Sequence, residues 1–302
     1  MTEDNTKMQT KTIVITGGNA GLGYWAAEQL ASQGHRIILA SRNAEKSAKA
    51  IASIIERIPG AKVEFQELDL ADLHSVERAA VELQKLPQID VLLLNAGVVG
   101  SRRYRTTAQG YELQIGTNHL GHFALSAALL TKLEAQAEAK ILHLGSISHR
   151  WARLPQDSLF PKRYHNFVNY AVSKLSVMTF GFALARLLEE RKSPVKSIVV
   201  HPGFSWDHFD KDVPEFLQKK PLPWYLALIL RPIAQGKQQG AQVLSFVADS
   251  TVPKSGEYWG PDGFFQLKGK AALRIAKPWS RNEKSAQHLW NFSEALGFVT
   301  ID

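Results

Sequence analysis

At 302 residues, 45% of them hydrophobic and 21% charged, the chain has an ordinary globular composition and could form one large α/β domain or two small ones. It contains no cysteine, which excludes disulfides and thiolate chemistry and makes a reducing cytoplasm the expected compartment. The formal net charge of +8 comes from scattered basic residues without a nucleic-acid-binding motif, so we expect an anionic cofactor and no nucleic acid.

The N-terminal segment predicts a phosphate-binding turn. Met1 to Thr10 is polar and lacks the apolar core of a signal peptide, and no run in the chain approaches the roughly 20 apolar residues of a membrane span. A buried strand at Lys11–Thr16 leads into a glycine-rich turn and a helix from Tyr24 to about Ser32. Glycine lets the backbone approach a pyrophosphate, and the helix N-terminus supplies N–H donors. The residues assigned to this cradle are Gly17, Asn19, Gly21, Leu22 and Gly23; a turn that binds nothing is the alternative.

The next strand, Arg36 to Ala40, bears on the choice of cofactor. In dinucleotide folds an acidic residue at the end of this strand binds the 2′-hydroxyl of NAD, whereas a nearby arginine accommodates the 2′-phosphate of NADP. Here Ser41 and Arg42 follow the strand and no carboxylate is present. These residues predict NADPH or NADP+, and the alternative is a surface arginine at a helix start.

Helices and strands then alternate. Helices are expected at 44–58 and 73–85 and strands at 63–67 and 89–94, with Asp69, Leu70, Asn95, Ala96 and Gly97 following the strands. This alternation predicts right-handed crossovers and a Rossmann-type doubly wound parallel sheet of about seven strands with helices on both faces. Ligands bind such sheets at the carboxyl ends of the strands.

A helix around 114–123 and a strand at 140–144 precede Ser146, and a loop at 150–165 leads to a long helix from Asn166 to about Glu190. Tyr170 and Lys174 lie four apart on one face of that helix. A neighbouring ammonium lowers the pKa of a phenol, which would make Tyr170 a proton donor or acceptor near neutral pH. A Tyr-x-x-x-Lys match alone is frequent by chance, and Ser146 alone could be a loop serine.

After a strand at 195–201 and Pro202-Gly203, the segment Phe204–Pro232 is rich in apolar residues, above all at Leu222–Leu230. It predicts either a helix packed on the core or an apolar lid over a substrate, and less strongly a membrane-surface contact. A helix near 239–248, a last strand at 257–259 and a mixed tail follow. No linker divides the chain, so one domain is expected at 1–302, with a cofactor half at about 11–150 and a catalytic half at about 151–302.

In this order, the motifs resemble those of the short-chain dehydrogenase/reductase family from Thr12 to roughly Gly263. The matching residues are Thr16, Gly17, Gly21, Gly23, Asn95, Ala96, Gly97, Asn118, Ser146, Tyr170, Lys174, Pro202 and Gly203. The residues at 118–123 and 40–43, with the long separation of Ser146 from Tyr170, resemble the retinol-dehydrogenase-like branch.

The resemblance implies hydride transfer between a nicotinamide cofactor and a carbonyl or alcohol. Tyr170 would protonate the substrate oxygen, Ser146 would bond to it, Lys174 would lower the tyrosine pKa and hold the nicotinamide ribose, and Asn118 would position a relay water. The implied cofactor contacts also include Asp69, Leu70, Pro202, Gly203 and Ser205. Three positions depart from the family pattern: Leu94 replaces an asparagine, Asn19 stands where some NADP-dependent members are basic, and Asp207 replaces a threonine that contacts the carboxamide, a contact Ser205 could supply.

The sequence therefore favours an NADPH-dependent carbonyl reductase or alcohol dehydrogenase of a bulky apolar substrate, a monomer or homodimer. An NADPH-binding regulator without turnover and a carbon–carbon double-bond reductase are the alternatives.

Overall fold

The described chain, residues 10–297 and 301 without 101–102, 156–158 and 161–162, has a central sheet of eight strands in the computed structural model. The strands are β1 (Thr12–Thr16), β2 (Arg36–Ser41), β3 (Lys62–Glu67), β4 (Val91–Leu94), β5 (Lys140–Leu144), β6 (Lys196–Val200), β7 (Tyr258–Pro261) and β8 (Ala271–Leu273). They lie in the order β3-β2-β1-β4-β5-β6-β7-β8, with β1 to β7 parallel and β8 antiparallel to β7. The predicted doubly wound parallel sheet is confirmed, and β8 extends it.

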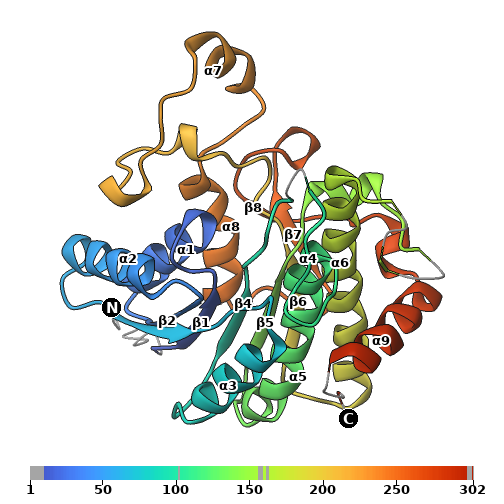
Figure 1. The fold of residues 1–302 in the computed structure, drawn as a ribbon. Helices are drawn as coiled ribbons and strands as arrows, with labels where there is room; N and C mark the ends of the chain where they lie inside the picture. Colours follow the sequence, from blue (N-terminus) through green and yellow to red (C-terminus); the bar gives the residue numbers. More distant parts are fainter. Residues whose placement is uncertain (1–9, 101–102, 156–158, 161–162, 298–300, 302) are drawn as a thin grey trace, which may run out of the picture.

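Helices cover both faces of the sheet (Figure 1). The principal ones are α1 (Gly21–Ser32), α2 (Ala44–Arg57), α3 (Leu73–Gln84), α4 (Leu113–Ile115), α5 (Gly121–Glu134), α6 (Asn166–Glu190), α7 (Trp224–Leu230), α8 (Lys237–Asp249) and α9 (Glu283–Gly297). Successive strand residues point to opposite faces. Ile13 and Ile15 of β1 therefore pack with α1, α2 and α8, whereas Val14 packs in the cluster of α3, α5, α6 and α9.

One helix within the described residues, α6, is long and apolar enough to cross a membrane by length and composition. However, 83% of its apolar window is buried inside the protein. The apolar residues of α6 are therefore explained by their place in the protein core.

The C-terminal tail, expected only as a mixed segment, contains regular elements. It forms β8 and α9, and α9 packs on α5 and α6. Leu289 of α9 is buried in the same cluster as Phe123 and Phe180. The three-residue β8 is too short to show a strand period, so its sequence gives no strand signal.

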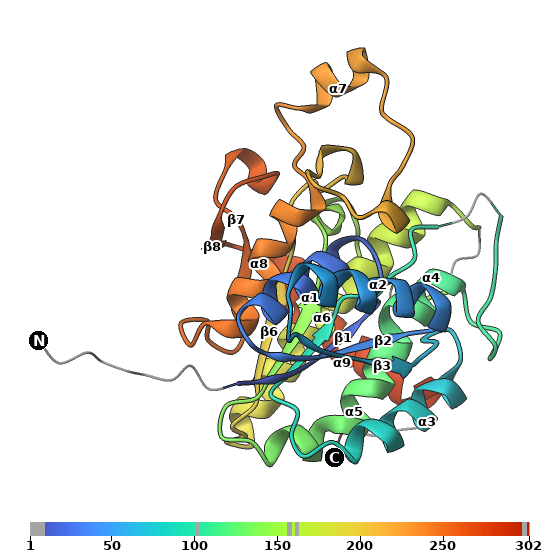
Figure 2. The ribbon, with the colours of Figure 1, turned by 90° about the vertical axis from the view of Figure 1, so that its left-hand side faces the viewer.

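The apolar segment after β6 forms an excursion from the sheet. Its two ends are joined by a backbone pair between Ser205 and Gln235, and the amide of Trp206 donates to the carbonyl of Gln235 at 2.9 Å. At its far end, α7 stands clear of the rest of the protein in two perpendicular views (Figures 1 and 2). None of its seven residues is buried, and Trp224 and Leu228 are 78% and 65% exposed. The interpretation of this run as a helix packed on the core is therefore wrong.

Candidate active site

The glycine turn joins β1 to α1 at the carboxyl end of the sheet. Gly17 has φ +65 and donates its amide to the carbonyl of Ala40 at 2.7 Å. A Cβ atom on Gly23 would lie 2.4 Å from the carbonyl oxygen of Gly17, so no side chain fits there. The helix begins at Gly21 and not at Tyr24 as expected, so Gly21 and Leu22 stand at its N-terminus and Asn19 lies in the turn before it. This cradle fits the phosphates of a dinucleotide, because the turn leads into the N-terminus of α1 and Gly23 has no room for a Cβ.

The turn after β4 is tied to the turn after β1. Asn95 donates from Nδ2 to the carbonyl of Thr16 at 2.8 Å, and the amide of Ala96 donates to Thr16 Oγ1 at 2.9 Å. A Cβ atom on Gly17 would lie 3.0 Å from Cα of Ala96. Two of the predicted cofactor-binding segments are thus held side by side.

Ser41, the last residue of β2, and Arg42, which follows it, lie in different environments. Ser41 is buried, and its hydroxyl shares a 2.7 Å hydrogen bond with that of Ser47 on α2. Arg42 is exposed, and Asn43 caps α2 by accepting from the amide of Lys46 at 2.7 Å. Only Arg42 of the predicted pair therefore presents its polar group to solvent.

Asp69 and Leu70 follow β3. Asp69 accepts from the amide of Ala71 at 2.9 Å, which shapes the turn. Leu70 is buried, and a Cβ atom on Gly121 would lie 2.4 Å from its carbonyl oxygen. The close approach of α5 to this turn explains the glycine at position 121.

Four predicted catalytic residues come together from three elements. Tyr170 and Lys174 lie on α6, Ser146 follows β5, and Asn118 lies in a π-helical turn, Gly116–Leu120, between α4 and α5. Single π-helical turns of this kind are frequent at functional sites. The Tyr170 and Ser146 side chains lie close enough for the serine hydroxyl to act on the pKa of the tyrosine.

Asn118 and Lys174 meet beside Gly97. A Cβ atom on Gly97 would lie 3.3 Å from Asn118 Oδ1 and 3.4 Å from Lys174 Nζ. Asn118 is fixed by Val98, whose amide donates to Oδ1 at 2.7 Å, and by a 2.9 Å bond from Nδ2 to Ser173 Oγ. The amide therefore links the loop after β4 to α6.

Burial sets the ionisation of the pair on α6. Burial raises the pKa of Tyr170, and the nearby Ser146 hydroxyl acts in the opposite direction without reversing the shift. Burial also lowers the pKa of Lys174 to about 8. The ammonium donates to the carbonyl of Leu144 at 2.8 Å. The lowered tyrosine pKa expected from the spacing is therefore not found here.

The turn that carries Ser146 is braced by residues that the sequence did not indicate. His149 Nδ1 bonds to the carbonyl oxygen of Ser146 at 2.7 Å, which makes Nδ1 the donor. Trp279 Nε1 donates to the carbonyl of His149 at 3.1 Å. No sequence motif marks this pair, because Trp279 belongs to the tail.

The turn after β6 is close-packed. Gly203 has φ +73, and a Cβ atom on it would lie 2.2 Å from the carbonyl oxygen of Leu267. Pro202 accepts at its carbonyl from Ser205 Oγ and from Gln235 Nε2, each at 2.7 Å. Because its hydroxyl is bonded to Pro202, Ser205 does not present a free donor in place of the missing threonine.

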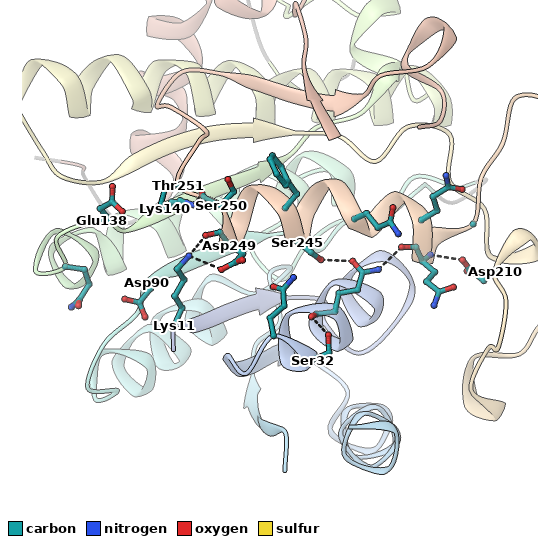
Figure 3. Close-up of a pocket in the computed structure, with 18 of the residues that line it drawn as sticks. Lys11, Ser32, Asp90, Glu138, Lys140, Asp210, Ser245, Asp249, Ser250 and Thr251 are labelled. Atoms are coloured by element: carbon teal, nitrogen blue, oxygen red, sulfur yellow. Dashed lines mark hydrogen bonds and ion pairs between the residues drawn. The ribbon is translucent and has the colours of Figure 1, made fainter. Parts of the chain in front are cut away.

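A separate polar groove runs between α1 and α8 on one face of the sheet (Figure 3). Its lining includes Lys11, Ser245 and Asp249, and none of the four predicted catalytic residues. The groove is therefore distinct from the candidate active site at the carboxyl ends of the strands.

The chain is similar to known proteins over nearly its whole length. A family profile described as short chain dehydrogenase matches residues 11–212. Human retinol dehydrogenase 12 is 33% identical over 299 residues, which cover 97% of this chain and 88% of the relative. Human retinol dehydrogenase 11 is 37% identical over 298 residues, which cover 97% and 87%.

Solved structures share the fold. The crystal structure of an uncharacterized protein from Mycobacterium paratuberculosis has a TM-score of 0.78 at 30% identity and covers 98% of this chain and 97% of that chain. L-Sorbose reductase from Gluconobacter frateurii, solved with NADPH and L-sorbose, has a TM-score of 0.64 at 20% identity and covers 83% and 94%. At that identity the second likeness concerns the fold alone.

Proposed function

The chain belongs to the short-chain dehydrogenase family, in its retinol-dehydrogenase-like branch, and on that premise we propose that it is an NADPH-dependent oxidoreductase interconverting a carbonyl group and an alcohol on a bulky apolar substrate. The observation that carries the proposal is that the Tyr170 and Ser146 side chains come close together, while Lys174 and Asn118 meet beside Gly97. This proximity supports a site in which one substrate oxygen bonds to both hydroxyl groups.

In reduction, Tyr170 donates its proton to the substrate oxygen, and its raised pKa keeps the phenol protonated at neutral pH. Ser146 bonds to the same oxygen as negative charge develops on it. Lys174 and Asn118 stand on the Gly97 side and supply a positive charge and a hydrogen-bonding amide. The glycine turn would hold a nicotinamide dinucleotide, which when bound would supply or accept the hydride.

The preference for NADPH is supported by Arg42. It is exposed at the end of β2, and a guanidinium gives a phosphate paired, charge-assisted hydrogen bonds. No carboxylate follows β2 to accept from a free ribose hydroxyl.

The apolar substrate is supported by the excursion after β6, whose ends are paired next to Gly203 and whose tip, α7, is wholly apolar. We propose that this excursion closes over the substrate. Relatives are named retinol dehydrogenases, so retinol and its aldehyde are included among the substrates to be tested.

The test is NADPH oxidation by the full chain with a panel of aldehydes, ketones and enones. We expect turnover of aldehydes or ketones. Tyr170→Phe should abolish it while NADPH still binds, and Ser146→Ala should lower kcat by about 10²–10³-fold. Reduction of enones alone would favour the double-bond reductase. Binding of NADPH without any turnover would favour the regulator, and substantial activity in Tyr170→Phe would remove Tyr170 from the acid–base role.

A further inference from the structure

A lysine from α8 reaches the glycine turn. α1 begins at Gly21, whose φ is +55, and packs beside α8, which begins at Lys237 (Figure 1). The nearest atoms to a Cβ built on Gly21 all belong to Lys237, with Nζ at 3.1 Å and Cδ at 3.4 Å. The ammonium therefore lies against the backbone that forms the phosphate cradle.

Asp207 holds this lysine in place. Its Oδ1 lies 2.9 Å and its Oδ2 3.0 Å from Lys237 Nζ, and Oδ2 also accepts from Lys219. Burial alone would raise the pKa of Asp207, but the hydrogen bonds from the two lysines outweigh burial and bring the pKa below its ordinary value. The carboxylate is thus charged at neutral pH and orients Lys237.

The other carboxylate at this helix start has its own partner. Asp210 accepts from the amide of Gln238 at 2.7 Å and so caps α8, as seen from the side of the α1–α8 groove (Figure 3). Lys237 is therefore not needed to satisfy the hydrogen bonding of Asp210. The single negative charge of Asp207 is already paired with Lys219. Lys237 is a second lysine on the same carboxylate, so the three side chains together carry one excess positive charge, which can attract an anion.

No residue of the glycine turn itself, Gly17 to Gly23, is basic. A pyrophosphate carries two negative charges, and the turn supplies backbone N–H groups and the dipole of α1. The residue in the turn that is basic in some NADP-dependent relatives is Asn19 here. We propose that Lys237 binds the pyrophosphate of the nicotinamide dinucleotide and that Asp207 positions Lys237 for this contact.

This assignment gives a role to the residue that departs most from the family pattern. Asp207 stands where a threonine is expected to contact the carboxamide of the nicotinamide, but both of its oxygens are engaged by lysines. Its contribution to cofactor binding is therefore indirect and passes through Lys237. The inference rests on the proposed function only in requiring that a nicotinamide dinucleotide binds.

The test uses two fragments of NADPH and calorimetric binding to the full chain. The first fragment, 2′-phospho-ADP-ribose, contains the pyrophosphate, whereas the second, 2′-AMP, lacks it. Lys237→Gln should weaken binding of the first by about 10- to 100-fold, the range of a lost charge-assisted hydrogen bond, and leave binding of the second unchanged. Lys237→Arg should restore most of the affinity for 2′-phospho-ADP-ribose. Asp207→Asn should weaken binding of 2′-phospho-ADP-ribose by less than Lys237→Gln does, and it should leave binding of 2′-AMP unchanged. Lys284→Gln on α9 is the matched control.

Unchanged affinity of Lys237→Gln for 2′-phospho-ADP-ribose would overturn the assignment. An equal loss for both fragments would also overturn it, because it would reveal a general distortion of the site. If wild type binds neither NADPH nor NADH, the proposed function fails and this inference with it. If wild type binds NADPH and Lys237→Gln binds equally well, only this inference fails.

Discussion

The ammonium of Lys174 donates to the carbonyl oxygen of Leu144 across 2.8 Å, so the lysine is anchored to the end of β5. Burial lowers its pKa to about 8, and its proton is therefore lost as the pH rises through about 8. If the proposed role of Lys174 needs the positive charge, kcat/KM for carbonyl reduction should fall above that pH. Lys174→Arg, which keeps its charge to much higher pH, should move this limb of the pH profile to alkaline values. If kcat/KM falls at the same pH in wild type and in Lys174→Arg, the fall is not caused by deprotonation of Lys174.

Buried histidines predict a loss of stability in acid. Burial lowers the pKa of His119 and His143 to about 3 and that of His122 to about 4, against an unfolded value near 6.5. The unfolded chain therefore binds more protons below pH 6.5, and stability is lost as the pH falls from there toward the folded values. At pH 5 each such histidine should cost at most about 2 kcal/mol.

Urea unfolding at pH 7 and pH 5 measures this loss. His119→Gln should narrow the difference in unfolding free energy between the two pH values. Equal stability of wild type at both pH values would refute the linkage.

The apolar tip of the excursion should act on substrates and not on stability. Trp224→Ser combined with Leu228→Ser should raise KM for large apolar substrates more than for small ones, because the lid loses apolar contact. The melting temperature should barely change, since both side chains are exposed. Val81→Ser with Val252→Ser, two exposed apolar residues elsewhere, is the matched control. A lower melting temperature with unchanged selectivity would contradict the lid.

Wild type should prefer NADPH to NADH. Arg42→Leu combined with Ser41→Asp should reverse the preference, mostly through KM, because the contact is remote from the reacting carbon and acts as uniform binding. Because the Ser41 hydroxyl is bonded to Ser47, Arg42→Leu alone should account for most of the lost NADPH affinity. The preference is measured by steady-state kinetics of wild type and the variants with NADPH and with NADH. Equal kcat/KM for the two cofactors in wild type would refute the predicted preference.

The sequence by itself determined the parts whose signals are local. The strand, glycine turn and helix at residues 11–32 follow from hydrophobic periodicity and glycine spacing, and the alternation to residue 200 predicts the parallel sheet. The four-residue spacing places Tyr170 and Lys174 on one face of α6. Each of these signals is carried by residues that are close together in the sequence.

Only the tertiary structure decided contacts between distant segments. Lys174 bonds to Leu144 and not to the neighbouring turn of its own helix, and Trp279 of the tail braces the turn of Ser146. Lys237 lies against Gly21 although α8 and α1 are far apart in the chain. Periodicity reports which face of an element is buried but not which residue of another element meets it. That pairing depends on how the sheet brings strand ends together, which no local pattern encodes.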